Sequence, residues 1–389
     1  MSMQLYIIIP QRLVFISLLI SAALFHDSTH AELQGEWQTT EQTTKIAYLT
    51  SWSLPHNAVS LLSKSNADVY ILSFARWDKS GRISSSNGLL DLPKASPKHI
   101  PQSYLTWTQL AHEFPHKKMI ISFGGQEFED IWDSMGTDVS IEKLAQSITQ
   151  LLNTKFPVYT RTSMIGKTLP NKAVSNAHKY SADKSQTSCN QCVYHLLGYT
   201  TLSGIDFDFE HSTRLTEKQN GLLTNLVKLI RKKVGKEKLI ALTTYHVGAD
   251  PLNCANPKIT ADCSFIRHDR SKHHGEVRPL LASTLGVFDF YNIMTYDAGR
   301  EFDYKTAMAN YNSIIKQASK LRLGVSINRQ WGPYGGFVMP HHENVSRVKW
   351  LKEQGFGGYF LWALGASTEL RDLHSQIALF NELSGASEE

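Results

Sequence analysis

The chain has 389 residues, of which 42% are apolar, and a formal net charge of +5. Its length suits a single α/β barrel with insertions, and its apolar content is enough for one large core, which excludes a chain that is disordered throughout. The net charge is small and no Lys/Arg stripe is interleaved with aromatic residues, so we expect no nucleic-acid partner.

The N-terminal residues 1–31 have the pattern of a secretory signal peptide. Arg12 precedes an apolar run over residues 13–25 that is too short to cross a bilayer of about 30 Å, so no stable membrane insertion is expected. An uncleaved anchor that also uses residues 5–9 is the alternative. We predict a secreted protein, periplasmic in a Gram-negative host, in which residues 32–44 form a short lead before the folded domain.

From residue 45 onward, short β-branched or aromatic runs alternate with amphipathic stretches. The predicted strands are residues 45–52, 68–75, 118–125, 202–210, 239–245, 288–296, 321–327 and 356–364. Eight strands, each followed by a helix, predict a parallel sheet with right-handed crossovers that closes into one (β/α)8 barrel over residues 45–385. An open doubly wound sheet is the rival, but its Gly-rich phosphate turn is missing after the first strand.

Several predicted helices carry clear end signals. Apolar residues recur at helical spacing over residues 140–153. Thr216 is expected to cap the helix over residues 216–234, and Gly355 to end the helix over residues 342–355.

Two insertions depart from the regular alternation. Residues 154–200 precede the fourth strand, which predicts the bottom face of the barrel, away from catalysis. Residues 246–275 follow the fifth strand, which predicts the top face, and we expect their His-rich end at 268–275 to be a solvated loop.

The cysteines predict disulfides, because an exported chain usually oxidises its thiols. They are Cys189, Cys192, Cys254 and Cys263. Of the three possible pairings, short loops favour Cys189 with Cys192 and Cys254 with Cys263. Free thiols, or a metal site in which His178 and His195 join the first pair, are the alternatives.

The stretch SGIDFDFE, residues 203–210, places three acids at alternate positions of one strand. Alternate side chains share a face, so Asp206, Asp208 and Glu210 are expected to point into the barrel and to rise toward its top. Burying three carboxylates is costly, which argues against a purely structural role. Desolvation and mutual repulsion raise the pKa of such groups, and Glu210 at the top is then a candidate general acid.

This one-sided ladder does not fit a glycosidase that uses two carboxylates, because Asp208 and Glu210 approach from the same side. The nucleophile must come from another strand, from water or from the substrate. A Mg²⁺ or Ca²⁺ site is the alternative for such a row of acids.

The motifs together resemble those of glycoside hydrolase family 18. SGIDFDFE is similar to the family signature D-G-x-D-x-D-x-E, with Ser203 in place of the first Asp. SFGG at residues 122–125 resembles S-x-G-G, MTYD at residues 294–297 resembles M-x-Y-D, and Trp362 matches the Trp beneath the sugar. The resemblance extends over residues 45–385.

The resemblance implies hydrolysis of β-1,4 linkages after N-acetylglucosamine, as in chitin, with net retention and no cofactor or metal. The substrate's own acetamide attacks its anomeric carbon, which would supply the missing nucleophile. Glu210 would protonate the leaving oxygen and later activate water. Asp208 would orient the acetamide, Asp206 would hold Asp208, and Tyr296 would bond the acetamide oxygen.

The substrate-binding candidates that follow from the resemblance and the strand ends are Trp362, Asp297, Met294, Ser122, Gly124, Gly125 and Tyr245. The alternative for Ser122 and the two glycines is a tight strand end, and for Met294 it is core packing. Residues 328–341 are too few for the α+β insertion domain of many relatives, so an open groove is expected.

The sequence therefore predicts a secreted, monomeric chitinase whose partners are chitin or chito-oligosaccharides. An endo-β-N-acetylglucosaminidase acting on glycoprotein glycans is one alternative, because it would share the barrel and the acids. A non-catalytic chitin-binding barrel is the other, although such relatives often lose an acid or the Trp that this chain retains.

Overall fold

The computed structural model describes residues 43–52, 54–163, 192–267, 270–327, 339–365 and 372–385. The expected signal peptide at 1–31 and most of the lead at 32–44 lie outside these ranges. Among the helices that are described, none is both long and apolar enough to cross a membrane.

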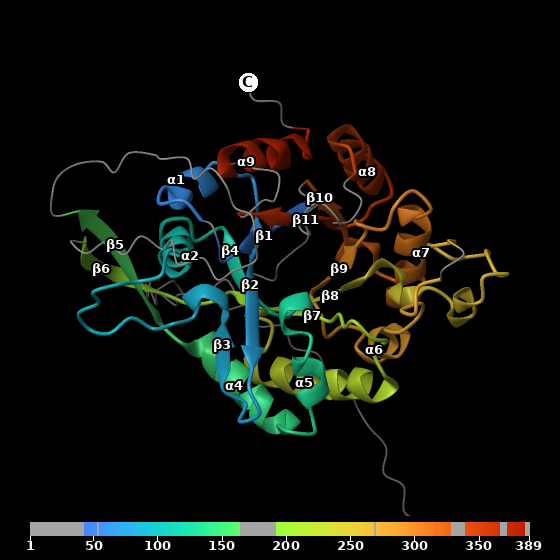
Figure 1. Cartoon of the computed structure of the whole chain (residues 1–389), viewed down its shortest axis with the longest axis horizontal. Helices are drawn as coiled ribbons and strands as arrows, with labels where there is room; N and C mark the ends of the chain where they lie inside the picture. Colours follow the sequence, from blue (N-terminus) through green and yellow to red (C-terminus); the bar gives the residue numbers. More distant parts are fainter. Residues whose placement is uncertain are drawn as a thin grey trace, which may run out of the picture. The chain divides into compact units, whose positions relative to one another are not determined.

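Eight parallel strands close into a barrel (Figure 1), because β1 pairs with β2 on one side and with β11 on the other. The barrel strands are β1 (Thr44–Thr50), β2 (Val69–Trp77), β4 (Lys118–Gly124), β7 (Gly204–Asp208), β8 (Leu239–Tyr245), β9 (Phe290–Met294), β10 (Leu321–Ser326) and β11 (Gly358–Leu364). A short strand, β3 (Ile83–Ser85), pairs antiparallel with β2. The predicted (β/α)8 barrel is confirmed, and the doubly wound open sheet is excluded.

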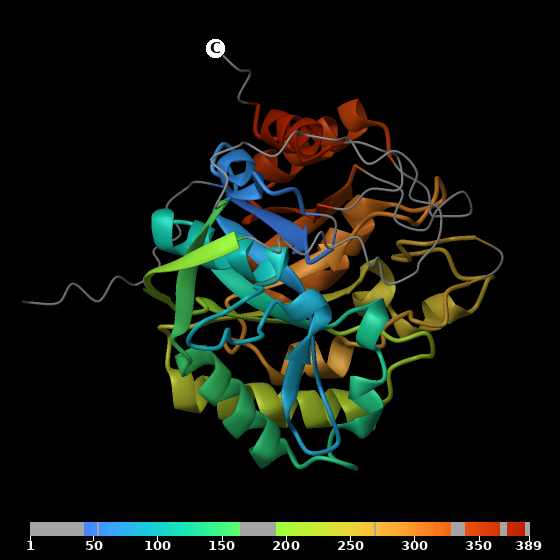
Figure 2. The ribbon, with the colours of Figure 1, turned by 60° about the vertical axis from the view of Figure 1, so that its left-hand side comes forward.

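Helices surround the barrel (Figure 2). The described helices are α1 (Ala58–Leu62), α2 (Gln102–Glu113), α3 (Ile131–Ser134), α4 (Ile141–Asn153), α5 (Glu217–Val234), α6 (Arg278–Ser283), α7 (Tyr304–Ile315), α8 (His341–Glu353) and α9 (Leu373–Glu382). Thr216 caps α5 as predicted: its side chain accepts from Gln219 N, and Gln219 Oε1 accepts from Thr216 N. Only residues 327–340 separate β10 from α8, which leaves no room for an α+β insertion domain.

The alternation of side chains in β7 divides the core into two parts. Ile205, Phe207 and Phe209 face the helices and are fully buried. Trp132 of α3 packs edge-on against Phe209, with the ring centroids 5.0 Å apart. The opposite face of the strand looks into the barrel, where a separate apolar cluster includes Ile120 and Phe360.

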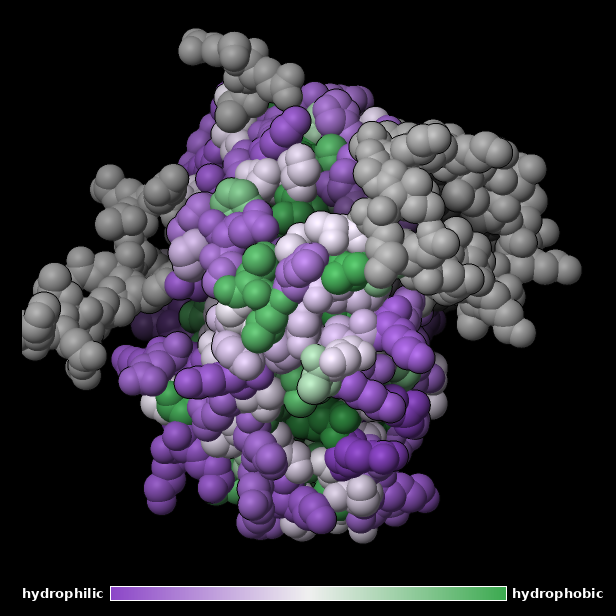
Figure 3. Space-filling model, turned by 90° about the vertical axis from the view of Figure 1, so that its left-hand side faces the viewer, coloured by the Kyte–Doolittle hydropathy of each residue, from purple (hydrophilic) through white to green (hydrophobic). Residues whose placement is uncertain are grey.

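The first insertion forms an antiparallel hairpin of β5 (Phe156–Ser163) and β6 (Cys192–Thr200). It lies against the outer side of α2, where Tyr104 Oη donates to Pro157 O and Gln109 Nε2 donates to Tyr159 O. Some side chains of the hairpin are exposed to solvent, on the side of the molecule that Figure 3 views. The exposed large apolar residues of β6 are Leu196, Leu197 and Tyr199.

The far end of this hairpin reaches the top of the barrel, so the prediction that residues 154–200 stay at the bottom face is wrong. Arg161 Nη2 lies 2.6 Å from His56 Nδ1 in the loop after β1, and it donates to Gln102 Oε1 at the start of α2. The insertion does begin at the bottom, where α4 ends. However, an extended strand of this length spans the height of the barrel.

Candidate active site

The acids of β7 form a ladder that rises toward the top of the barrel, the face at the C-terminal ends of the strands. Asp206 and Asp208 lie inside the barrel and are buried, and Glu210 follows just beyond the end of β7 with partial exposure. Parallel pairing places Ser122 of β4 beside Asp206, and Thr243 of β8 beside Asp208. The structure therefore brings the predicted acids together on one inner face.

At the base of the ladder, Asp206 accepts hydrogen bonds from three neutral hydroxyls. Its Oδ2 accepts from Tyr48 Oη at 2.8 Å and from Ser122 Oγ at 2.7 Å. Its Oδ1 accepts from Thr243 Oγ1 at 2.9 Å. Burial raises the pKa of Asp206 to about 6, although these hydrogen bonds lower it. Ser122 has no exposed surface, so it supports the ladder rather than reaching a substrate directly.

Asp208, the middle acid, has a buried oxygen without a partner. No described residue forms a hydrogen bond with its Oδ1 atom. Burial, followed by the negative charges of Glu210 and Asp206, raises the pKa of Asp208 well above its ordinary value. Burial therefore favours the protonated form of this carboxyl group, and its Oδ1 atom remains available to a ligand.

Glu210 has the pKa that a general acid/base needs. Burial raises the pKa of Glu210 to about 7. Hydrogen bonds from the Tyr245 hydroxyl and the Gln126 backbone N–H lower this pKa, whereas the charges of Glu129 and Glu276 raise it. A carboxyl group that is part protonated at neutral pH can donate a proton and take one back.

Ser203 lies below the ladder, directly before the start of β7. Its backbone N–H donates to Met119 O at 2.7 Å, and its Oγ accepts from Met119 N at 3.3 Å. Ser203 thus joins the start of the ladder strand to β4, and it brings no further negative charge to the base.

Aromatic side chains form one wall beside the acids. The Trp362 ring of β11 stacks on Phe74 with the centroids 5.6 Å apart and meets Tyr48 edge-on at 5.2 Å. Trp362 is partly exposed. Tyr296, just after β9, packs edge-on against Phe360, and burial and the neighbouring acids raise its pKa. A partly exposed indole that contacts Tyr48, a hydrogen-bond partner of Asp206, suits the apolar face of a sugar ring.

The glycines at the end of β4 serve close packing. Gly124 and Gly125 have φ angles of 98° and 65°, which side chains rarely adopt. A Cβ atom on Gly124 would lie 2.4 Å from Trp132, and one on Gly125 would lie 2.7 Å from Phe74. Met294 is also buried, at 7% exposure. These positions fit the packing alternatives that the sequence left open.

Asp297 lies at a cavity between the loops after β8 and β9. The cavity has a volume of about 380 Å³, and its lining residues are His246, Phe265, Arg267, Ser271, Asp297, Ala298 and Gly299. Burial lowers the pKa of His246 to about 4, so its imidazole is neutral at physiological pH. The cavity therefore offers both charged and aromatic groups to a ligand.

The loop after β8 is closed by the predicted disulfide between Cys254 and Cys263, with an S–S distance of 1.99 Å. The prediction that this loop lies on the top face is confirmed, because it follows the C-terminal end of β8. Cys192 is also disulfide-bonded. Cys189, its predicted partner, lies outside the described residues.

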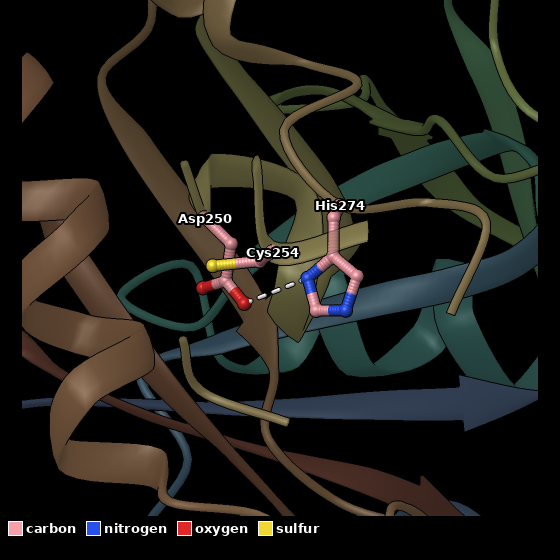
Figure 4. A group of neighbouring side chains, drawn as sticks. All are labelled: Asp250, Cys254 and His274. Atoms are coloured by element: carbon pink, nitrogen blue, oxygen red, sulfur yellow. Dashed lines mark hydrogen bonds and ion pairs between the residues drawn. The ribbon is translucent and has the colours of Figure 1, made fainter. Parts of the chain in front are cut away.

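A second tie within this loop joins Asp250 to His274, whose Nδ1 atom lies 2.9 Å from Asp250 Oδ2 (Figure 4). With Cys254, these side chains have the spacing of a metal-binding group. However, Cys254 is oxidised in the disulfide, and both Asp250 oxygens already accept hydrogen bonds, from Ser264 and Asn310 as well as from His274. The cluster is therefore a structural connection within the loop.

The expectation that residues 268–275 form a solvated loop is wrong for its C-terminal part. His274 is fully buried, and His273 is mostly buried against Tyr245. The charged residue that follows, Glu276, is buried as well. Tertiary contacts to β8 and to the segment before α5 draw these polar residues inward.

A barrel with a buried ladder of acids, a proton donor at its top and an aromatic wall defines the class of glycoside-hydrolase barrels. The model of the glycosyl hydrolases family 18 matches residues 35–334, and the chain belongs to this family. No curated protein matches the chain by sequence.

Solved structures share the fold at low identity. A GH18 chitinase from Pseudoalteromonas aurantia aligns with a TM-score of 0.54 at 14% identity, over 87% of this chain and 100% of that chain. A mutant class V chitinase from Nicotiana tobaccum in complex with NAG4 has a TM-score of 0.54 at 12% identity, over 89% and 100%. A chitinase-like agglutinin from Robinia pseudoacacia has a TM-score of 0.52 at 12% identity, over 87% and 98%.

Proposed function

We propose that this family 18 protein is a chitinase that cleaves β-1,4 linkages between N-acetylglucosamine units with retention of configuration. The observation that carries the proposal is the position of Glu210, with a pKa of about 7, at the top of a ladder whose middle acid has a pKa raised well above its ordinary value. No second carboxylate of β7 faces Glu210 across the site, which fits a substrate whose own acetamide is the nucleophile.

The proposed reaction has two steps. Glu210 protonates the leaving oxygen while the acetamide oxygen of the sugar attacks the anomeric carbon, which yields an oxazolinium ion. Asp208 and Tyr296 hold the acetamide, and Asp208 stabilises the positive charge as its proton passes toward Asp206. Glu210 then removes a proton from a water molecule as the water oxygen attacks the anomeric carbon. This attack opens the oxazolinium ring and gives net retention.

The sugar would stack on Trp362, and Asp297 and Tyr245 would line the groove. The Nicotiana tobaccum neighbour was crystallised with NAG4, which supports an N-acetylglucosamine oligomer as the first ligand to test. With only residues 327–340 between β10 and α8, we propose an open groove that cuts within chains. Release of dimers alone from chain ends would contradict internal cleavage.

The decisive assay is hydrolysis of chitotetraose, with the product anomers followed by NMR. The β-anomer should form first, because two inversions give retention. Glu210→Gln keeps the shape of the site and removes the transferable proton, so kcat should fall by about 10³-fold. Glu353→Gln, on the exposed end of α8, is the matched control. Parent-like turnover by Glu210→Gln would refute the assignment of the acid.

The same assay separates the alternatives. An endo-β-N-acetylglucosaminidase would release glycans from a high-mannose glycoprotein and leave chitotetraose intact. A binding-only barrel, as the name of the Robinia pseudoacacia agglutinin suggests for that protein, would bind chitotetraose without turnover in both the parent and Glu210→Gln.

We also propose that the protein is exported and acts as a monomer. N-terminal sequencing of protein recovered outside the cytoplasm should begin near Glu32. A start at Met1 would contradict cleavage. Size-exclusion chromatography with light scattering should give the monomer mass.

A further inference from the structure

Tyr245 connects the candidate general acid to the loop after β8. Its hydroxyl lies close enough to the Glu210 carboxyl to lower the pKa of that group. Its backbone carbonyl, at the end of β8, accepts from Tyr311 Oη at 2.6 Å. The backbone of Tyr245 is thereby fixed, and the direction of its hydroxyl depends on what packs against the ring.

His273 packs against that ring. The ring centroids of Tyr245 and His273 lie 4.6 Å apart at an interplanar angle of 48°. On its other side, His273 Nδ1 lies 2.8 Å from Glu276 Oε2. The Glu276 carboxylate therefore fixes the position of the imidazole, and the imidazole limits rotation of the tyrosine ring.

Glu276 is a buried carboxylate that the proposed reaction leaves without a role. Its side chain has no exposed surface. Oε2 also accepts from Leu215 N at 2.9 Å, and Asn220 Nδ2 donates to Glu276 O at 2.9 Å. Oε1 has no partner among the residues that the structure describes. Glu276 thus joins its loop to the segment that leads from Glu210 into α5.

A second connection between these segments strengthens the first. Arg214 Nη1 donates to Lys272 O at 2.7 Å and to His274 O at 2.8 Å. The chain on both sides of His273 is therefore joined to the chain that follows Glu210. Such ties restrict movement of the acid.

We propose that Tyr245, His273 and Glu276 form a positioning relay that holds the Glu210 carboxyl for proton transfer and sets the pH range in which it works. The proposal rests on the proposed role of Glu210 as the general acid. Neutral glutamine could accept the same hydrogen bonds as Glu276. A buried carboxylate adds a negative charge that faces Glu210, which is the physical reason for its presence.

The relay acts on Glu210 in two opposite ways. The Tyr245 hydrogen bond stabilises the ionised carboxylate, whereas the Glu276 charge stabilises the protonated form. Among the described residues, the other titratable groups that interact electrostatically with Glu210 are Asp208, Glu129 and Tyr296. Because these groups stay unchanged in the variants below, any change in titration reports on the relay.

The test is the alkaline limb of kcat/KM on chitotetraose, where a general acid loses its proton. Glu276→Gln should move this limb to lower pH by about half a pH unit, because a nearby negative charge is gone. Tyr245→Phe should move it to higher pH, because the ionised form loses a donor. His273→Phe keeps ring packing but loses the bond to Glu276, so kcat should fall several-fold with little change in KM.

Controls and a second readout keep the outcomes separate. His374→Phe and Glu353→Gln, on exposed positions of α9 and α8, should match the parent. In addition, ¹³C NMR titration of the glutamate carboxyls, with Glu210 assigned by Glu210→Gln, measures the same pKa shifts without turnover.

Opposite shifts in Glu276→Gln and Tyr245→Phe support the relay. The relay is overturned if neither variant changes the alkaline limb of kcat/KM or the pKa of Glu210 measured by NMR. Loss of turnover in Glu210→Gln would still support the proposed function in that case. If the parent cleaves none of the substrates, the proposed function fails. The NMR titrations then decide on the relay alone.

Discussion

Asp206 and Glu210 lie at the two ends of one ladder, and different parts of the chain supply the groups around them. Asp206 is held by hydroxyls from barrel strands, on Tyr48, Ser122 and Thr243, all inside the barrel. Glu210 is surrounded by groups beyond the strand ends, among them Gln126 and Glu276. The lower end is therefore built into the scaffold, whereas loops determine the upper end, where a family can vary without changing the barrel.

Asp208 links the two ends, so its replacement gives the largest expected effect on this comparison. Asp208→Asn keeps the size of the side chain but cannot pass a proton to Asp206. We expect kcat on chitotetraose to fall by about 10²-fold or more, because the charge of the intermediate loses its stabilising group. An unchanged kcat would mean that the ends work independently.

The disulfide belongs to the loop end alone. Replacing both Cys254 and Cys263 by Ser opens a loop with a sequence separation of 9. Loss of this loop closure should lower the free energy of unfolding by about 2–3 kcal/mol. Urea unfolding measures this change, and the alkaline limb of the pH profile should move as the relay loosens. If the alkaline limb of kcat/KM changes while the free energy of unfolding stays close to that of the parent, the disulfide acts on the loop and not on the barrel.

At the base of the ladder, we expect a smaller effect, which is a pH dependence of the free energy of unfolding that comes from Asp206. The pKa of Asp206 is raised from 3.8 to about 6 in the folded protein, so its contribution to stability is present below pH 4 and is lost as pH rises through 6. The free energy of unfolding of the parent, minus that of Asp206→Asn, should fall by about 2 kcal/mol between pH 4 and pH 7. Urea titrations at both pH values test this difference, and a flat difference would contradict it.

Much of the barrel could be predicted because its signals are local. The predicted strand 239–245 coincides with β8, and Thr216 caps α5 where a capping residue was expected. The inward direction of Asp206 and Asp208 followed from side-chain alternation alone. The partners of Asp206 were missed at Tyr48 and Thr243. Each of these two residues is a polar side chain at an inward position of an apolar strand. That position can be recognised only once the register of the barrel strands is known.

The β5–β6 hairpin and the loop before α6 show where sequence reasoning stopped. The hairpin was placed by the point at which it leaves the barrel, yet packing against α2 carries Arg161 up to His56. His273 and His274 read as solvated polar residues, but carboxylate partners make their burial favourable. Both errors concern contacts between segments far apart in the chain.

The sequence by itself determined the barrel, its order of strands and the face on which the acids lie, because strand periodicity and helix caps act over a few neighbouring residues. Only the tertiary structure decided what surrounds Glu210. Its proton affinity depends on burial and on charges such as Glu276, which the closed barrel brings together from separate loops, and no local pattern encodes those distances.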